Sequence, residues 1–202
     1  CALPISAIMK IVFATNNSNK LKEIRASVNT IEVLSLADIG FESDIPEEQD
    51  TLEGNALQKA NYIFEKYKLP VFSDDTGLEV NALEGRPGVY SARYAGEHCS
   101  SDDNMDKLLL EMVDRTGLEA SFRTVIAFVD GKNEYTFEGS VAGVILRERS
   151  GEKGFGYDPI FQPSGFKMSF AEMSLKDKNK ISHRGRAVKK FVEFLKNTYQ
   201  II

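Results

Sequence analysis

Two adjacent acidic residues, Asp74 and Asp75, follow the apolar pair Val71-Phe72 at the expected end of a buried strand. Ligands in open α/β sheets collect at the carboxyl ends of strands. Carboxylates are costly to bury unless a cation, hydrogen bonds or a shifted pKa compensates them. Because side chains alternate along a strand, we expect the two acids to face opposite ways, so that only one reaches a given cleft. The alternative is a plain turn before Thr76-Gly77, but a turn would not require so apolar an approach.

A polar loop joins another expected buried strand, residues 9–15, to the start of a helix. Such a junction presents backbone N–H groups and the positive end of the helix dipole, which suit a phosphate, and a lysine adds a full charge. The loop lacks the glycines and the Gly-Lys-Ser/Thr ending of a Walker loop. An Asn-rich helix cap with a solvated lysine is the alternative. The loop consists of Thr15, Asn16, Asn17, Ser18, Asn19 and Lys20.

An acidic loop at residues 42–53 carries the neighbouring Glu47 and Glu48. Mg²⁺ takes oxygen ligands, usually one or two carboxylates with waters and substrate phosphates completing its shell. A solvated acidic surface is the commoner explanation of such a run. The loop is therefore a candidate metal site only in combination with other motifs.

Two later segments could bind a base or a phosphate. Residues 154–159 (GFGYDP) combine glycines, which allow close backbone approach, with Phe155 and Tyr157, which could stack on a base. A tight turn with core aromatics is the alternative. Residues 178–186 (KNKISHRGR) form a cationic cluster around His183 that could donate hydrogen bonds to a phosphate or a keto oxygen. Its alternative is a basic helix N-terminus, which the helix dipole disfavours. Together, these motifs indicate a nucleoside phosphate site.

The elements that position these motifs alternate between strand and helix patterns in the first half of the chain, and a long hairpin follows in the second. We expect strands at residues 9–15, 31–36, 71–77, 78–83, 122–129 and 135–146, the third ending within 73–77. We expect helices after residue 19, from 52 until Pro70 prevents continuation, after the capping residues 101–103, and around 186–199. The prediction is an α/β fold, a central mixed twisted sheet with flanking helices in two lobes around a nucleotide cleft.

The composition sets limits on the function. The chain has 202 residues, 42% hydrophobic and 27% charged, which suits a globular protein and excludes a disordered tail or a coiled coil. A net charge of −5 argues against binding a nucleic acid polymer. Two distant cysteines make no disulfide framework or zinc motif, which favours the cytoplasm. No apolar run approaches the roughly 20 residues that cross a membrane.

We expect residues 1–8 to be a cloning remnant or an ill-defined extension before a native start at Met9, and residues 9–202 to form a single two-lobed domain.

Five ordered motifs resemble those of the non-canonical purine nucleoside triphosphate pyrophosphatases, the inosine/xanthosine triphosphatase or Ham1-like family. They are TNNSNK at 15–20, SDDTGL at 73–78, PGVYSARY at 87–94, GFGYDP at 154–159 and SHR at 182–184. The resemblance runs from about Met9 to the final helix. It implies hydrolysis of ITP, dITP and XTP between the α and β phosphates, with Mg²⁺ as cofactor, yielding a nucleoside monophosphate and pyrophosphate. It also implies a homodimer that cleanses the nucleotide pool.

The resemblance assigns roles to individual residues. Loop 15–20 would bind the triphosphate, Asp75 would be the general base and a metal ligand, and Thr76 would contact the substrate. The metal-binding glutamate of the family lies eight residues before an asparagine, here Asn55, which indicates Glu47. This chain departs from the family there, with Glu48-Gln49 in place of Thr-Gly and Gly54 in place of a common Glu, so Glu48 is a possible substitute. The residues around base and sugar would be Phe155, Gly156, Tyr157, Asp158, Lys178, His183 and Arg184.

Base selectivity has a chemical basis. Hypoxanthine and xanthine present a keto oxygen at position 6, where adenine presents an amino donor, so a donor from Arg184, His183 or a backbone N–H favours the former. Guanine shares the keto group, so its rejection must rest on the 2-amino position. Two alternatives stay open. One is a pyrophosphatase for other modified or pyrimidine nucleotides, and the other is a nucleotide sensor without turnover.

Overall fold

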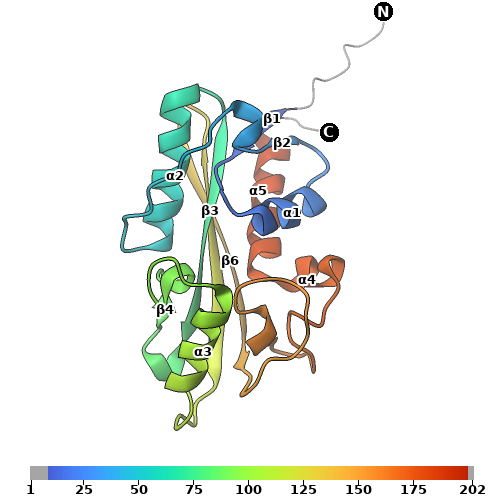
Figure 1. Cartoon of the computed structure of the whole chain (residues 1–202). Coiled ribbons are helices and arrows are strands. Elements are labelled where there is room, and N and C mark those ends of the chain that lie inside the picture. Colours follow the sequence, from blue (N-terminus) through green and yellow to red (C-terminus); the bar gives the residue numbers. More distant parts are fainter. Residues whose placement is uncertain (1–8, 200–202) are drawn as a thin grey trace, which may run out of the picture.

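The computed structural model describes residues 9–199, and its centre is a seven-stranded mixed sheet (Figure 1). The strand order is β2-β1-β3-β5-β6-β7, with β4 paired to β3. Pairs β1/β2 and β1/β3 are parallel and the others antiparallel. The strands are β1 (Lys10–Phe13), β2 (Glu32–Leu34), β3 (Val71–Val80), β4 (Pro87–Gly88), β5 (Glu119–Val129), β6 (Glu134–Ile145) and β7 (Phe161–Pro163). The helices are α1 (Ser18–Ser27), α2 (Leu52–Tyr67), α3 (Ser101–Glu111), α4 (Leu175–Ile181) and α5 (His183–Tyr199).

The predicted α/β fold with a mixed sheet is confirmed. Residues 1–8, expected to be a remnant or extension, lie outside the described residues.

Strand β3 runs without interruption through the acidic pair, so the expected strand end at 73–77 is wrong. Asp74 and Asp75 pair with Ile126 and Val125 of β5, and the ladder continues to Val80. The polar sequence looks like a loop, but its side chains find partners on both faces of the sheet, which makes a continuous strand possible. The predicted hairpin at 130–133 is confirmed, with the side chain of Asp130 accepting hydrogen bonds from two turn amides.

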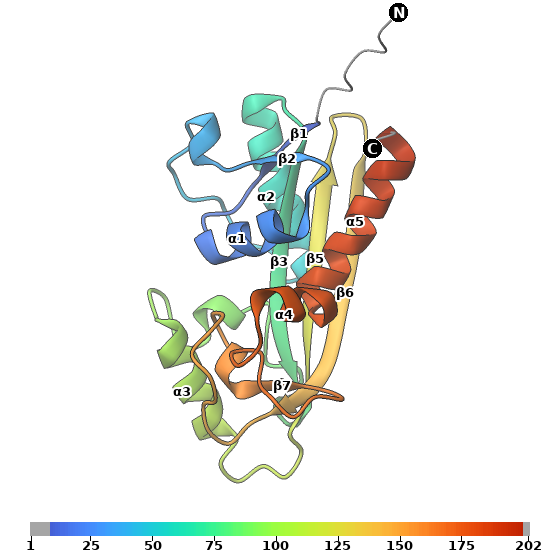
Figure 2. The same ribbon diagram turned by 90° about the vertical axis from the view of Figure 1, so that its right-hand side faces the viewer.

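One edge of β3 is open where the acids lie. Strand β1 pairs only with residues 71–72 of β3, and β4 pairs only with 78–79, on the same edge. Residues 73–77 between them pair with β5 alone. This edge of β3 is therefore unpaired at residues 73–77. The unpaired stretch lies between the lobe that holds β1, β2 and α1 and the lobe that holds β4 and α3 (Figures 1 and 2).

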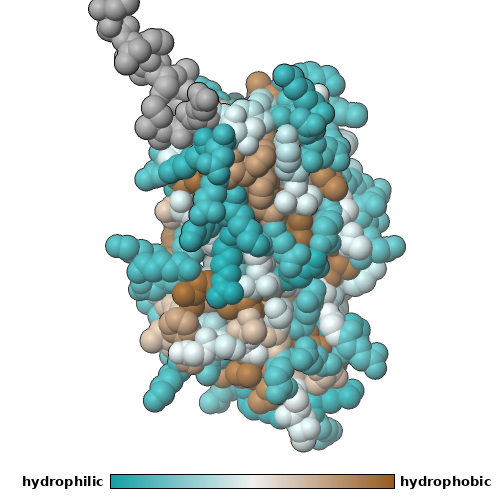
Figure 3. Space-filling model, turned by 180° about the vertical axis from the view of Figure 1, so that it is seen from behind, coloured by the Kyte–Doolittle hydropathy of each residue, from teal (hydrophilic) through white to brown (hydrophobic). Residues whose placement is uncertain are grey.

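Three apolar clusters hold the helices to the sheet. Phe72 and Phe128 pack against Phe191 of α5 on one face, while Val125 and Ala127 pack against α2 on the other. The lobe with α3 has its own core, which includes Leu78, Phe122, Phe161 and Leu108. Alternation along β3 and β5 thus feeds both faces, as the period of a strand requires. The reverse face of the molecule is largely hydrophilic with scattered apolar areas (Figure 3).

Two helix boundaries differ from the sequence-based expectation. The final helix begins at His183 rather than near Arg186, because Ser182 is extended and its hydroxyl accepts a hydrogen bond from the Gly185 amide, as an N-cap does. The N-cap of α3 is Ser100, in a capping box with Asp103, so the cap lies just before the expected residues. Within residues 9–199, we find no helix with the length and apolar character that a membrane crossing needs.

Candidate functional site

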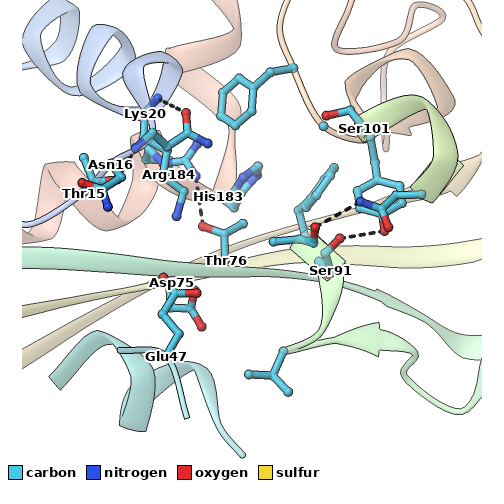
Figure 4. A pocket seen from close by; sticks show the side chains of 18 of the residues that line it. Thr15, Asn16, Lys20, Glu47, Asp75, Thr76, Ser91, Ser101, His183 and Arg184 are labelled. Carbon is cyan, nitrogen blue, oxygen red and sulfur yellow. Dashed lines mark hydrogen bonds between the residues drawn. The ribbon is translucent and has the colours of Figure 1, made fainter. Parts of the chain in front are cut away.

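A cavity of about 480 Å³ lies at the open stretch of β3 and is lined from both lobes (Figure 4). Of the site residues predicted from the sequence, Ser18 and Asn19 do not line it; they lie exposed in the first turn of α1. The structure brings the others together, namely Thr15, Asn16, Asn17, Lys20, Glu47, Asp75, Thr76, Phe155, Gly156, Tyr157, Asp158, Lys178, His183 and Arg184.

The loop after β1 is both a helix cap and a wall of the cavity. The Asn17 side chain accepts hydrogen bonds from the amides of Asn19 and Lys20, at 3.0 and 3.1 Å, and so caps α1. Asn16 Nδ2 lies 3.3 Å from Asp44 Oδ1, which ties the loop to the acidic segment. Asn17, the N-cap of α1, and Lys20 both line the cavity, so the positive end of the helix dipole adjoins it and Lys20 adds a charge there.

Asp74 anchors a buried ion-pair network on one face of β3. Lys20 Nζ lies 3.1 Å from Asp74 Oδ1, and Arg184 Nε donates to Asp74 Oδ2 at 3.0 Å. Burial alone would raise the pKa of Asp74, but the charges of Lys20 and Arg184 outweigh it and hold that pKa well below its ordinary range. Arg184 also donates from Nη1 to Glu23 Oε2 at 2.5 Å and from Nη2 to Thr76 Oγ1 at 3.0 Å. Its guanidinium is thus fixed from three sides.

Lys178 extends this network to the aromatic turn. Its ammonium donates to Glu23 Oε1 at 2.7 Å and to Asp158 Oδ2 at 2.6 Å. The Phe155 amide donates to the same Asp158 oxygen at 2.9 Å, which fixes the turn. Lys178 and Arg184 both line the cavity, yet each is about 97% buried or more and paired with carboxylates, so these ion pairs fix the positions of both cations.

Aromatic rings form the far wall. The His183 imidazole stacks on Phe122, with ring centroids 4.5 Å apart, and is almost completely buried. Burial first, and then the charges of Arg184 and Lys178, lower the pKa of His183 well below its ordinary value, so the imidazole is neutral. Among the described residues, His183 Nδ1 has no hydrogen-bond partner. A neutral ring beside Phe155 and Tyr157 suits a flat aromatic ligand.

Asp75 faces the opposite side of β3 from Thr76, as the alternation of side chains predicts (Figure 4). Asn55 of α2 donates to Asp75 Oδ2 at 3.2 Å, and Lys59 Nζ lies 3.4 Å from Asp75 Oδ1. Burial raises the pKa of Asp75 above its ordinary value, although Lys59 and Lys20 oppose the shift. A buried carboxylate of raised pKa beside a cleft has the character of a general base.

Glu47 reaches the same point from the acidic loop. Its Oε1 accepts a hydrogen bond of 2.5 Å from Lys59 Nζ, so two carboxylates converge on one cationic position. Glu48 instead is exposed, outside the cavity lining, and its carboxylate contacts Gln58. Carboxylate oxygens gathered around a cation are a donor set that suits Mg²⁺. Within residues 9–199 no group of three or more ligating side chains gathers, so substrate and water oxygens would complete the shell.

The residues that hold the predicted acids and cations in place were not predicted, namely Glu23, Asn55 and Lys59. Glu23 carries the ion pairs of Lys178 and Arg184, and its partners lie 155 and 161 residues away in the chain. Asn55 and Lys59 hold Asp75 from α2. A sequence signal for these two exists, because they stand one helical turn apart beside the buried Ala56, Ala60 and Ile63, where polar residues need a reason.

The chain is similar to known proteins of one family. The model of the Ham1 family matches residues 11–194. A protein of Flavobacterium psychrophilum named dITP/XTP pyrophosphatase is 51% identical over 94% of this chain and 100% of its own length. One of Porphyromonas gingivalis with the same name is 51% identical over 92% of this chain and 97% of its own. Among solved structures, a HAM1 protein from Coxiella burnetii superposes with a TM-score of 0.85 at 35% identity, covering 95% of this chain and 100% of that one.

Proposed function

The chain belongs to the Ham1 family and is a hydrolase of phosphoric anhydride bonds, and we propose that it converts the non-canonical purine nucleotides ITP, dITP and XTP to a monophosphate and pyrophosphate. The proposal rests on how strand β3 separates two kinds of side chain within one cavity. The neutral aromatic wall and the guanidinium of Arg184 lie on one side of the strand, and the convergent carboxylates of Asp75 and Glu47 lie on the other.

The triphosphate would span the open edge of β3. The four residues of loop 15–20 that line the cavity, Thr15, Asn16, Asn17 and Lys20, bind it beside the N-terminus of α1, while Thr76 contacts it from the middle of β3. Asp75, whose pKa burial raises, orients and deprotonates the attacking water. Glu47 and Asp75 would hold Mg²⁺, which when bound neutralises charge that develops on the phosphate oxygens.

The base would lie against the aromatic wall. Phe155, Tyr157 and the neutral ring of His183 supply flat surfaces, and the ion pairs of Lys178, Asp158 and Arg184 hold that wall in place. His183, Arg184 or a backbone N–H donates to the keto oxygen at position 6. Such a donor opposes the amino group of adenine, because two donors then face each other.

The domain organisation, the oligomeric state and the cellular role of the protein are also part of this proposal. Residues 9–202 would act as one two-lobed domain, two copies would form a homodimer, and the protein would cleanse the nucleotide pool of the cytoplasm. Gel filtration with light scattering measures the oligomeric state.

Product analysis separates this function from its alternatives. With ITP and Mg²⁺, we expect inosine monophosphate and pyrophosphate in equal amounts, and no turnover after the metal is chelated. Release of orthophosphate would contradict cleavage between the α and β phosphates. Tight binding of ITP without any product would instead identify a nucleotide sensor.

A further inference from the structure

Lys59 occupies a position that no step above requires. Its side chain extends from α2 with only 5% of its surface exposed, and its ammonium lies 2.5 Å from Glu47 Oε1 and 3.4 Å from Asp75 Oδ1. Asn55, one turn earlier on α2, holds the other oxygen of Asp75. The ammonium therefore lies where the two carboxylates converge, at the position that they would offer to a divalent cation.

The charges around Lys59 keep the ammonium in place. The carboxylates of Glu47 and Asp75 lie 2.5 and 3.4 Å from it, and burial of the lysine leaves little water to screen their attraction. Glu47 and Asp75 in turn repel each other, because each raises the energy of the other's charged form. A cation between them removes this repulsion, and in the described structure Lys59 provides it.

We propose that Lys59 is a built-in counter-cation that holds the metal position of Glu47 and Asp75 until a nucleotide binds. The inference rests on the proposed function, since it takes these two carboxylates as the metal ligands. For a divalent cation to enter, the ammonium must move away, and without nucleotide it has to give up both of its anionic partners. The phosphates of a nucleotide give the ammonium new anionic partners, so nucleotide and metal strengthen each other's binding.

The first consequence concerns metal binding without nucleotide. Lys59→Met removes the competing charge and leaves the two carboxylates facing each other. We expect its melting temperature without metal to lie below that of the wild type and to rise saturably with MgCl2 at constant ionic strength. We expect the dissociation constant for Mn²⁺, measured by electron paramagnetic resonance, to be about 10-fold tighter than in the wild type, or more.

Two matched variants control for charge and for loss of a lysine. Lys59→Arg keeps the cation and should bind Mn²⁺ as weakly as the wild type. Lys107→Met removes a lysine of α3 that donates to the Tyr94 carbonyl, outside the cavity lining, and should also match the wild type. In the double variant Glu47→Gln/Lys59→Met, the gain in affinity should disappear. A gain that persists there, or no gain in Lys59→Met, overturns the proposal.

A structure of the wild type with Mg²⁺ and a non-hydrolysable inosine triphosphate analogue tests the same point if Lys59→Met does not fold. We expect Lys59 Nζ to have left its bridging position between Glu47 and Asp75; an ammonium that still bridges both contradicts the inference. Neither metal titration nor structure depends on turnover. Failure of the wild type to hydrolyse ITP would therefore refute the proposed function separately.

Discussion

The neighbouring acids Asp74 and Asp75 have opposite electrostatic environments because they point to opposite faces of β3. Asp74 meets Lys20 and Arg184, and its pKa falls. Asp75 meets Lys59 and Asn55, and burial raises its pKa. One acid is therefore a permanent anion that fixes the guanidinium of Arg184, and the other can accept a proton. Asp74 therefore stabilises the structure, whereas Asp75 is available for the reaction.

The role of Asp75 predicts a specific loss. Asp75→Asn should lower the rate of pyrophosphate release from ITP by roughly 10²-fold or more, because a general base is lost. Binding of ITP, measured by calorimetry, should change far less. Asp50→Asn, at an exposed acid of the acidic loop 42–53, is the matched control and should keep full activity. An Asp75→Asn variant with wild-type turnover would remove this residue from the chemistry.

The role of Asp74 predicts a loss of stability. Asp74→Asn leaves two buried cations with one anionic partner fewer, which we expect to lower the free energy of unfolding by roughly 3 kcal/mol. Urea unfolding near neutral pH measures the difference. A loss of a few tenths of a kcal/mol would mean that Glu23 compensates Arg184 and that the ion pair of Lys20 with Asp74 contributes little.

The lowered pKa of Asp74 also fixes a pH dependence. A carboxylate with a depressed pKa in the folded state stabilises the protein fully above its unfolded value of 3.8, and this contribution is lost as the pH falls toward the folded value. The stability difference between wild type and Asp74→Asn should therefore be largest at neutral pH and shrink below about pH 4. A difference that stays constant from neutral pH to pH 3 would show that the charge of Asp74 is not its source.

At the scale of elements, the site depends on where α5 meets β6. A Cβ added to Gly139 of β6 would lie 2.2 Å from the His183 carbonyl oxygen and 2.4 Å from the Ala187 amide nitrogen. The strand thus allows the first turn of α5 to lie directly on it. That turn carries His183 and Arg184 into the cavity.

Gly139→Ala should therefore affect both stability and function. We expect a loss of about 1–3 kcal/mol from overpacking and a higher KM for ITP, because the first turn of α5 has to shift. Ser140→Ala, on the adjacent exposed position of β6, should be neutral in both respects. Unchanged stability and KM in Gly139→Ala would show that the contact relaxes elsewhere.

Periodicity predicted most elements, and the misses have physical reasons. Alternating apolar residues located the hairpin of β5 and β6, and the helical period located α2. Strand β3 was cut short because acids and a glycine resemble a loop, and only distant partners keep them in a strand. The cavity residues were predicted chiefly through five short motifs. Glu23 and Lys59 were missed because their importance comes from partners brought together by folding, such as Lys178 for Glu23.

For the whole molecule, the positions of the charged residues matter more than the net charge of −5. Four cations, Lys20, Lys59, Lys178 and Arg184, pair with five carboxylates at the cavity, in two groups of ion pairs. One group joins Lys59 to Glu47 and Asp75, and the other joins the remaining three cations to Glu23, Asp74 and Asp158. An acidic protein can therefore bind a triphosphate, because its cations are concentrated where the ligand would lie and a divalent cation would offset the surplus acid.

A substrate panel is the direct measurement of whether this protein hydrolyses purine triphosphates that carry a keto group at position 6. We predict that kcat/KM for pyrophosphate release from ITP, dITP and XTP exceeds that for ATP and CTP by roughly 10²-fold or more, and that chelating Mg²⁺ abolishes the activity. Equal kcat/KM values for ITP and ATP, or a preference for a pyrimidine triphosphate, would contradict the account.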